Sequence, residues 1–312
     1  MRYMFEMKNQ FARTMYEVGQ VNPKLVVVVG DLCHWAMQPF AKACPGRYYN
    51  TGVTEAATIG LGAGLSAVGL IPVVHLIAPF MVERSFEFIK LDFSYNEFPG
   101  NLVSAGSSFD YSFLGATHHT YTDYATLKTL PKTQLIYPAA PQEFDLLFRQ
   151  TYNNDFLTYF RLPQTEHGVS IDKNKIKVGT GIKIKDGEDI TIVATGSQLK
   201  SAVESAETLK KMDYDPEIIY IHTLKPLDTK LITSSAEKTK KIITMEEHSI
   251  IGGLYADVLE AVKEIPGVKV SPIAIPADFL RGYGGYEDHC KALGLTAEGI
   301  VKKVKTDFRR KK

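Results

Sequence analysis

Segments typical of buried β-strands alternate with segments typical of amphipathic helices along the whole 312-residue chain. The first of these strands is the continuous apolar run Leu-Val-Val-Val-Val at residues 25–29, which predicts a strand buried on both faces. An alternation of strands and helices requires crossover connections, which join parallel strands. We therefore expect an α/β fold with mostly parallel sheets, and the length is sufficient for two domains of ordinary size.

The pattern divides the chain into three parts. Residues 1–165 form a first α/β domain, residues 166–188 are read as a linker with an edge hairpin, and residues 189–312 form a second α/β domain. From about residue 162 to residue 189 the pattern weakens, with Pro163 at its start followed by several glycines and scattered lysines. Helices are expected over 4–19, 54–68, 81–93, 199–212, 251–262 and 296–304, and further strands over 71–77, 102–105, 190–194, 217–221 and 241–245.

Composition excludes several classes of protein. The net charge of +1 provides no field for binding nucleic acid or an anionic membrane surface, and the basic tail at 308–312 is read as a solvated terminus. Three cysteines without paired spacing argue against a disulfide framework and a zinc site, and fit a reducing cytoplasm. The start of the chain lacks a signal-peptide pattern, and the apolar runs are too short to span a membrane.

Glu55 begins the predicted helix 54–68, within the segment Asn-Thr-Gly-Val-Thr-Glu-Ala-Ala at residues 50–57. One interpretation is that this acid only complements the helix dipole. The other is that it is a functional carboxylate in a segment that is otherwise small and apolar. Three glycines follow in the helix, and because glycine costs helix stability, they indicate close packing against another surface.

Two further motifs follow predicted strands. Phe80 stands where the strand at 71–77 gives way to a helix, and its ring either belongs to the core or presents a face to a flat heterocycle. His118 and His119 lie in a loop after the strand at 102–105, and such loops leave the sheet at its ligand-binding edge. Adjacent residues point in opposite directions, which disfavours a shared metal ion.

In the second domain, residues 245–254 are read as a strand, a loop and the start of a helix. The Gly-Gly pair in this segment is weak evidence for anion binding.

Taken in order, these motifs resemble the C-terminal half of transketolase, which split transketolases carry as a separate subunit. The sequence is also similar to deoxyxylulose-phosphate synthase and to the β subunits of 2-oxo-acid dehydrogenases. The collinear parts are the Val-Thr-Glu segment at 53–55, the stretch 80–89, the Gly-Ala-Thr-His loop at 115–118, the Thr-Gly-Ser segment at 195–197, residues 223–228, and the Glu-Glu-His-Ser segment at 246–249. The resemblance covers nearly the whole chain and implies a pyrimidine-binding domain followed by a transketolase C-terminal domain.

The resemblance implies that thiamine diphosphate is the cofactor. Glu55 then corresponds to the glutamate that hydrogen-bonds the aminopyrimidine ring and favours its imino tautomer, as a catalytic and cofactor-binding residue. Phe80 corresponds to the ring that packs on the aminopyrimidine. Ile77 takes a place that is aromatic in full-length transketolase, and Asp31 matches an acid near the cofactor.

For the substrate, the resemblance gives His118 a catalytic role, contacting oxygens of the donor and shuttling protons. Arg161 corresponds to a residue that holds the substrate phosphate through its guanidinium fork. His34 completes the substrate-binding residues expected in the first domain, together with the two positions discussed next.

Two positions depart from the usual transketolase pattern. Leu114 stands where an aspartate reads a donor hydroxyl, and Gly106, with Ser107 beside it, replaces a phosphate-binding histidine. Ser107 and Leu114 are therefore included among the expected substrate contacts. The departures predict a substrate that is less hydroxylated than common sugar phosphates, or modified, and used in a specialised pathway.

The chain contains no Gly-Asp-Gly segment, which in thiamine enzymes binds the metal that holds the diphosphate. The resemblance then implies that Mg²⁺ (or Ca²⁺) and the diphosphate are held by a partner, the N-terminal transketolase subunit. No metal ligand is expected in this chain. We expect two copies of each chain, a small sugar phosphate as substrate, and the glycine-dotted helix after Glu55 as interface.

Three functions remain open from the sequence. The first is a subunit that transfers a two-carbon ketol unit. The second is the β subunit of a 2-oxo-acid dehydrogenase, and the third is a degenerate subunit that serves as a scaffold. The loop around His118 and the segment 246–254 favour the first over the second, and the joint presence of Glu55, His118 and Arg161 argues against the third.

Overall fold

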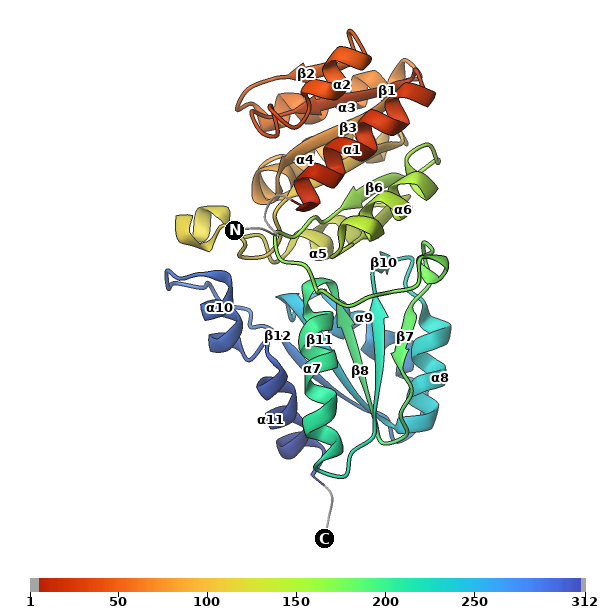
Figure 1. Cartoon of the computed structure of the whole chain (residues 1–312), viewed down its shortest axis with the longest axis vertical. Coiled ribbons are helices and arrows are strands. Elements are labelled where there is room, and N and C mark those ends of the chain that lie inside the picture. The colour runs from red at the N-terminus through yellow and green to blue at the C-terminus, as the bar shows by residue number, and fades with distance from the viewer. Residues whose placement is uncertain (1–5, 310–312) are drawn as a thin grey trace.

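The computed structural model describes residues 6–309, so the expected helix start at Met4 and the end of the basic tail lie outside the described residues. Two α/β units are stacked along the long axis of the molecule (Figure 1). The elements are α1 (Glu6–Val21), β1 (Leu25–Val29), α2 (Gln38–Ala43), β2 (Tyr48–Asn50), α3 (Glu55–Ala67), β3 (Ile71–Ile77), α4 (Phe86–Phe88), β4 (Gly100–Ala105), α5 (Asp123–Lys128), β5 (Thr133–Ile136), α6 (Pro141–Thr151), β6 (Leu157–Phe160), β7 (Ile182–Lys185), β8 (Ile190–Thr195), α7 (Leu199–Lys210), β9 (Pro216–Ile221), β10 (Thr223–Lys225), α8 (Thr229–Thr239), β11 (Lys241–Ser249), α9 (Leu254–Val262), β12 (Lys269–Ile275), α10 (Tyr286–Leu293) and α11 (Ala297–Asp307).

The first sheet has the order β10-β5-β6-β4-β3-β1-β2, and only the β10–β5 pair is antiparallel. The second sheet has the order β12-β11-β8-β9-β7, and only β7–β9 is antiparallel. The expected α/β class with two mostly parallel sheets is confirmed. All five residues of β1 are buried, as a strand covered on both faces requires.

Three expectations differ from the structure. The single helix expected over 81–93 is a π-helical turn at Phe80–Arg84, a short α-helix, and a second π-helical turn at Ile89–Tyr95. The expected edge hairpin is an edge strand, because β7 pairs with β9 rather than with its neighbour in sequence. The segment read as strand, loop and helix start remains in β11 as far as Ser249, so Glu246 and Glu247 are buried strand residues.

The two units meet in a buried polar junction. Tyr124 donates to Glu246 at 2.5 Å, and Gln198 donates to Glu247 at 2.7 Å. Asp110 lies in the same junction, where its Oδ2 accepts from the backbone N of Ser107 at 2.7 Å, while its Oδ1 is buried with no hydrogen-bond partner. Burial, with a smaller contribution from the charge of Glu247, raises the pKa of Asp110 to about 7. The unpartnered oxygen is the place where a proton fits.

The glycines of helix α3 differ in how closely other parts of the protein pack against them. A Cβ on Gly62 would lie 2.6 Å from Val74 Cγ2 and 3.2 Å from the ring of Phe93, so this face is in tight contact with β3 and the second π-helical turn. A Cβ on Gly64 would meet nothing within 4 Å. The close packing inferred from the glycines therefore rests on Gly62 within this chain. Among the described residues, no helix is both long and apolar enough to cross a membrane.

Gly62→Ala and Gly64→Ala are expected to change stability in opposite directions. Overpacking at Gly62 costs about 1–3 kcal/mol, only partly offset by the higher helix propensity of alanine, whereas Gly64→Ala gains about 0.5–1 kcal/mol. Urea unfolding of the two variants measures this difference. Equal effects of the two substitutions would contradict the packing described for α3.

Asp110→Asn is expected to flatten the pH dependence of stability. The folded chain holds a proton on Asp110 that the unfolded chain releases near pH 4, so this stabilisation is present below that pH and is lost as pH rises through about 7. One such proton contributes a slope of about 1.4 kcal/mol per pH unit at most. Urea unfolding between pH 5 and pH 8 should show the slope in the native chain and in the control Asp155→Asn, and a reduced slope in Asp110→Asn.

Candidate active site

The candidate residues collect at the carboxyl edge of the first sheet. Strands β4, β3, β1 and β2 are adjacent and parallel in that order, so the loops that follow them emerge side by side. Asp31 follows β1, Glu55 follows β2, Phe80 follows β3, and His118 lies in the loop after β4. This is the edge at which open parallel sheets bind ligands.

Glu55 is the first residue of α3, and only 8% of it is exposed. Its Oε2 accepts a hydrogen bond from Arg84 Nη1 at 3.0 Å, which is the one side-chain partner of this carboxylate among the described residues. The Arg84 guanidinium also lies over the ring of Phe80, 4.2 Å from its centroid. Glu55 and Phe80 therefore face the same planar cation. Arg84 was part of a motif in the sequence but carried no predicted role.

His118, in the loop that follows β4, contacts the same cluster through Phe80. Its ring packs edge-on against Phe80 with 5.0 Å between centroids, and Thr117 Oγ1 lies 2.9 Å from its Nδ1. A short turn places it there, because Gly115 adopts φ +79° and its carbonyl accepts from the His118 backbone N. Partial burial, and then the charge of Arg84, lower the pKa of His118, so the imidazole is neutral at neutral pH.

The remaining expected cofactor residues lie at neighbouring strand ends. Ile77 is the last residue of β3 and is partly exposed. Asp31 adopts φ +56° and is exposed, and its backbone N donates to Asn50 Oδ1 at 3.0 Å. The same Asn50 oxygen accepts from Gly52 N at 3.0 Å, so one amide joins the ends of β1 and β2. Asn50 had no predicted role, because the strand that it ends was not expected from the sequence.

Arg161, the expected phosphate ligand, is buried where the two domains meet. It is 1% exposed, its Nε donates to Asp123 at 2.8 Å, and its Nη2 donates to the carbonyls of Thr120 and Glu247 at 3.0 and 3.1 Å. The guanidinium also lies 4.7 Å from the Tyr137 ring centroid. The cation joins the two domains, but its Nη1 is buried with no hydrogen-bond partner, so one donor of the guanidinium fork is left over. Its role as a phosphate ligand stays a prediction.

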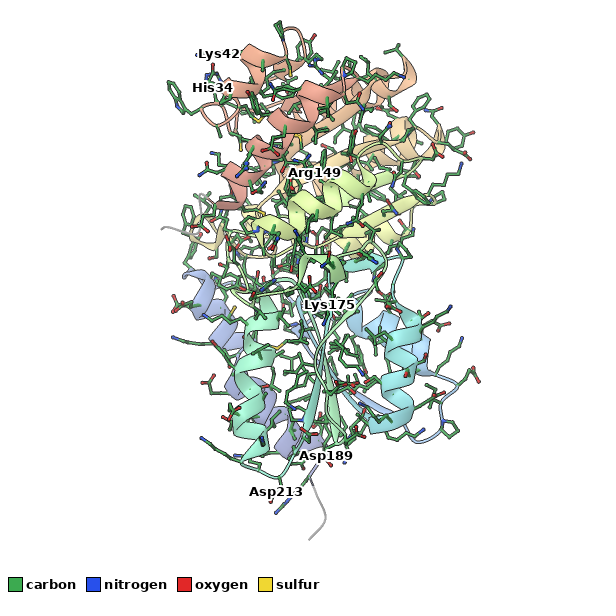
Figure 2. The ribbon with its side chains drawn as sticks, turned by 45° about the vertical axis from the view of Figure 1, so that its right-hand side comes forward. His34, Lys42, Arg149, Lys175, Asp189 and Asp213 are labelled. Atoms are coloured by element: carbon green, nitrogen blue, oxygen red, sulfur yellow. The ribbon has the colours of Figure 1, made fainter. Side chains whose placement is uncertain are left out.

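The other expected substrate residues are dispersed. Ser107 is buried and donates to Asp110, so it belongs to the junction rather than to an open site. Leu114 is 46% exposed on the turn just before Gly115, beside the loop of His118. His34 lies at the outer surface of the first domain, next to Gln38 (Figure 2). The structure thus brings Glu55, Phe80 and His118 together, whereas Ser107 lies in the junction, and Arg161 reaches the end of the His118 loop through the carbonyl of Thr120.

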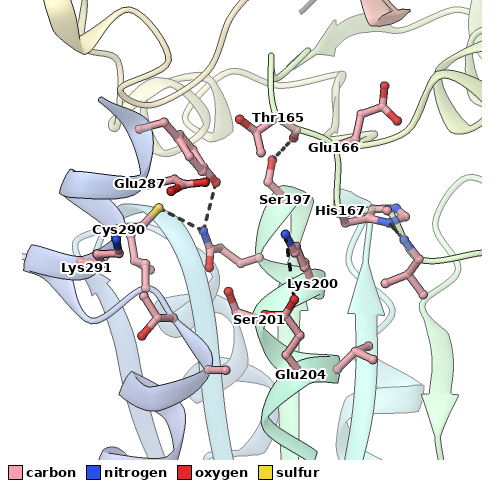
Figure 3. Close-up of a pocket in the computed structure, with 18 of the residues that line it drawn as sticks. Thr165, Glu166, His167, Ser197, Lys200, Ser201, Glu204, Glu287, Cys290 and Lys291 are labelled. Atoms are coloured by element: carbon pink, nitrogen blue, oxygen red, sulfur yellow. Dashed lines mark hydrogen bonds and ion pairs between the residues drawn. The ribbon is translucent and has the colours of Figure 1, made fainter. Parts of the chain in front are cut away.

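A cavity of about 1020 Å³ lies elsewhere, between the linker, α7 and α10 (Figure 3). None of the residues that the resemblance assigns to cofactor or substrate lines it. Some of its polar groups pair with one another, since Ser197 Oγ donates to the carbonyl of Thr165 at 2.5 Å and Lys200 lies 3.9 Å from Glu204. Glu166 Oε1 and Gln198 Oε1 are buried there without a hydrogen-bond partner. We therefore base the candidate site on the sheet edge. Within residues 6–309, no group of three His, Cys, Asp or Glu side chains is placed to hold a metal ion.

Comparison with known proteins accounts for nearly the whole chain. Residues 4–168 match the transketolase pyrimidine-binding domain, and residues 179–300 match the transketolase C-terminal domain. The chain is 30% identical to a subunit of the apulose-4-phosphate transketolase of Phocaeicola vulgatus, with 96% of each chain covered. It is 29% identical to a 6-deoxy-6-sulfo-D-fructose transketolase subunit of Clostridium sp., covering 95% of this chain and 92% of that one.

Two further comparisons show how much of each relative this chain covers. The 1-deoxy-D-xylulose-5-phosphate synthase of Halothermothrix orenii is 28% identical, and this chain covers 44% of its length. A solved structure described as an inactive β4 tetramer of a split-gene transketolase superimposes with a TM-score of 0.87 at 30% identity, covering 96% of this chain and 97% of that chain. With both of its domains matched and its length shared with subunits of split enzymes, the chain belongs to the transketolase family.

Proposed function

We propose that this chain is the C-terminal subunit of a thiamine-diphosphate-dependent transketolase that transfers a two-carbon ketol unit between sugar or sugar-phosphate substrates. The observation that carries this proposal is the grouping of Glu55, Phe80 and His118 at one sheet edge. Relatives that are named as transketolase subunits favour this function over that of a 2-oxo-acid dehydrogenase β subunit.

The residues present fit the aminopyrimidine of the cofactor. The Arg84 guanidinium is a flat group that donates N–H to the Glu55 carboxylate and stacks on the Phe80 ring, and the aminopyrimidine has both of these properties. Bound thiamine diphosphate supplies the nucleophilic thiazolium carbon. Glu55 holds a proton at the ring nitrogen, while Ile77 and Asp31 border the same pocket from β3 and β1.

His118 is the residue of this chain best placed to meet the substrate. Its neutral imidazole can donate to one substrate oxygen and accept a proton from another. Exposed Leu114 stands beside its loop, where an apolar side chain offers no partner to a sugar hydroxyl. This supports a substrate that is less hydroxylated than common sugar phosphates, or modified. The unpartnered Nη1 of Arg161 supports the proposal that this guanidinium contacts a substrate phosphate.

The second half of the cofactor site is proposed to lie on a partner. Because the chain has no Gly-Asp-Gly segment, the diphosphate and its Mg²⁺ (or Ca²⁺) are held by an N-terminal transketolase subunit, in a complex with two copies of each chain. Exposed apolar side chains on α3 and the segment after β3 supply a surface for association: Leu61, Val68, Phe88, Leu91 and Tyr95. The solved relative described as an inactive β4 tetramer supports this dependence on a partner.

Glu55→Gln is expected to lower turnover of the assembled enzyme by roughly 10²–10⁴-fold, because it removes a positioned proton-transfer group. Steady-state rates of ketol transfer provide the measurement, and an unchanged thermal unfolding midpoint confirms folding. Glu260→Gln, on the exposed face of the second domain, is the matched control. Near-native turnover in Glu55→Gln would refute the assigned role.

The isolated chain is expected to show no Mg²⁺-dependent binding of thiamine diphosphate by titration calorimetry, whereas the complex with its partner binds it. The reason is that the chain holds only the ring end of the cofactor, and the charged diphosphate has no ligands in it. Tight binding by the chain alone would overturn the divided site.

A further inference from the structure

Arg84 makes both of the contacts that the cofactor ring requires. Its Nη1 donates to Glu55 Oε2 at 3.0 Å, and its guanidinium lies 4.2 Å from the centroid of the Phe80 ring. The salt bridge has one buried and one accessible partner, because the Glu55 side chain is 9% exposed and that of Arg84 is 53% exposed. The cation therefore reaches inward from the surface to satisfy a buried carboxylate.

The guanidinium is chemically similar to a protonated aminopyrimidine. Both are planar and delocalised, both carry N–H donors in the plane, and both stack on aromatic faces. A carboxylate as buried as Glu55 is costly without a partner, so a chain that lacks cofactor needs a group of this kind. Arg84 supplies it, from the π-helical turn that begins with Phe80.

We propose, on the basis of the function proposed above, that Arg84 occupies the aminopyrimidine position of the empty site and is displaced when the cofactor binds. Arg84 is then a positioning residue. It pairs with Glu55 and covers Phe80 until the cofactor takes over the same two contacts. The exchange needs no unpacking of the core, because the Arg84 side chain is half exposed and can turn into solvent.

The exchange makes Arg84 a competitor of the cofactor. Removing it abolishes an ion pair and a cation–π contact in the empty state only, so cofactor affinity increases. From the usual strengths of such contacts at partly exposed sites, Arg84→Met should bind thiamine diphosphate roughly 5–20-fold more tightly and associate with it faster. Arg84→Lys, which keeps the charge but not the planar fork, should lie between the two.

The experiment is titration of the assembled complex with thiamine diphosphate at fixed Mg²⁺, using calorimetry for affinity and stopped-flow fluorescence for the association rate. Arg13→Met is the matched control, since Arg13 forms an exposed pair with Glu17 on α1. Thermal unfolding of each variant establishes that it is folded. Tighter binding by Arg84→Met, with Arg13→Met unchanged, supports the exchange.

Unchanged or weaker binding by Arg84→Met overturns it, and weaker binding would show that Arg84 holds the cofactor instead of yielding to it. These outcomes are distinct from failure of the proposed function, in which the native complex would not bind thiamine diphosphate at all or would bind it independently of Glu55. If cofactor binding depends on Glu55 but its affinity does not change when Arg84 is substituted, this inference is wrong while the proposed function stands.

Discussion

The buried guanidinium of Arg161 is the interaction on which the arrangement of the two domains depends. It extends from the end of β6 and bonds at once to Asp123, to the carbonyl that ends the His118 loop, and to the backbone of β11 in the second domain. Two segments far apart in the sequence, residues 120–123 and strand β11, are thereby fixed to one charge. Because a buried charge tolerates no loss of partners, the loop that bears His118 is held in place by the second domain as well as by its own turn.

Much of the fold follows from local pattern in the sequence. The apolar run of β1 and the small-residue helix α3 appear where their composition predicts them, since buried parallel strands and tightly packed helices leave strong signals. The interrupted helix after β3 does not, because the positions of π-helical turns depend on packing beneath them rather than on local propensity. Strand β11 is similar, because its acidic segment looks like a loop in the sequence. Its burial depends on a tyrosine donor from the first domain, Tyr124, and a glutamine donor from the turn after β8, Gln198.

The candidate site was predictable to the same mixed degree. Phe80 and His118 were singled out because each follows an expected strand, and Glu55 because it is a lone acid at a helix start. The resemblance to transketolase supplied their roles, and the parallel sheet brings all three to one edge. The sequence identified Arg161 as a candidate, but it could not show that Nε and Nη2 would be paired inside the protein and Nη1 left without a partner. Asn50 and Arg84 were missed, since their roles arise from contacts across loops that no spacing in the sequence reveals.

Strand β10 makes the first sheet depend on the second half of the chain. It is only three residues long and comes from the second half of the chain, yet it closes the first sheet beside β5. Cleaving the chain within the linker would leave β5 as an exposed edge strand of the N-terminal fragment. Its unpaired backbone N–H and C=O groups could then pair with strands of other molecules, which promotes aggregation. Neither half is therefore a self-sufficient module, and attempts to express the first domain alone should retain or replace this strand.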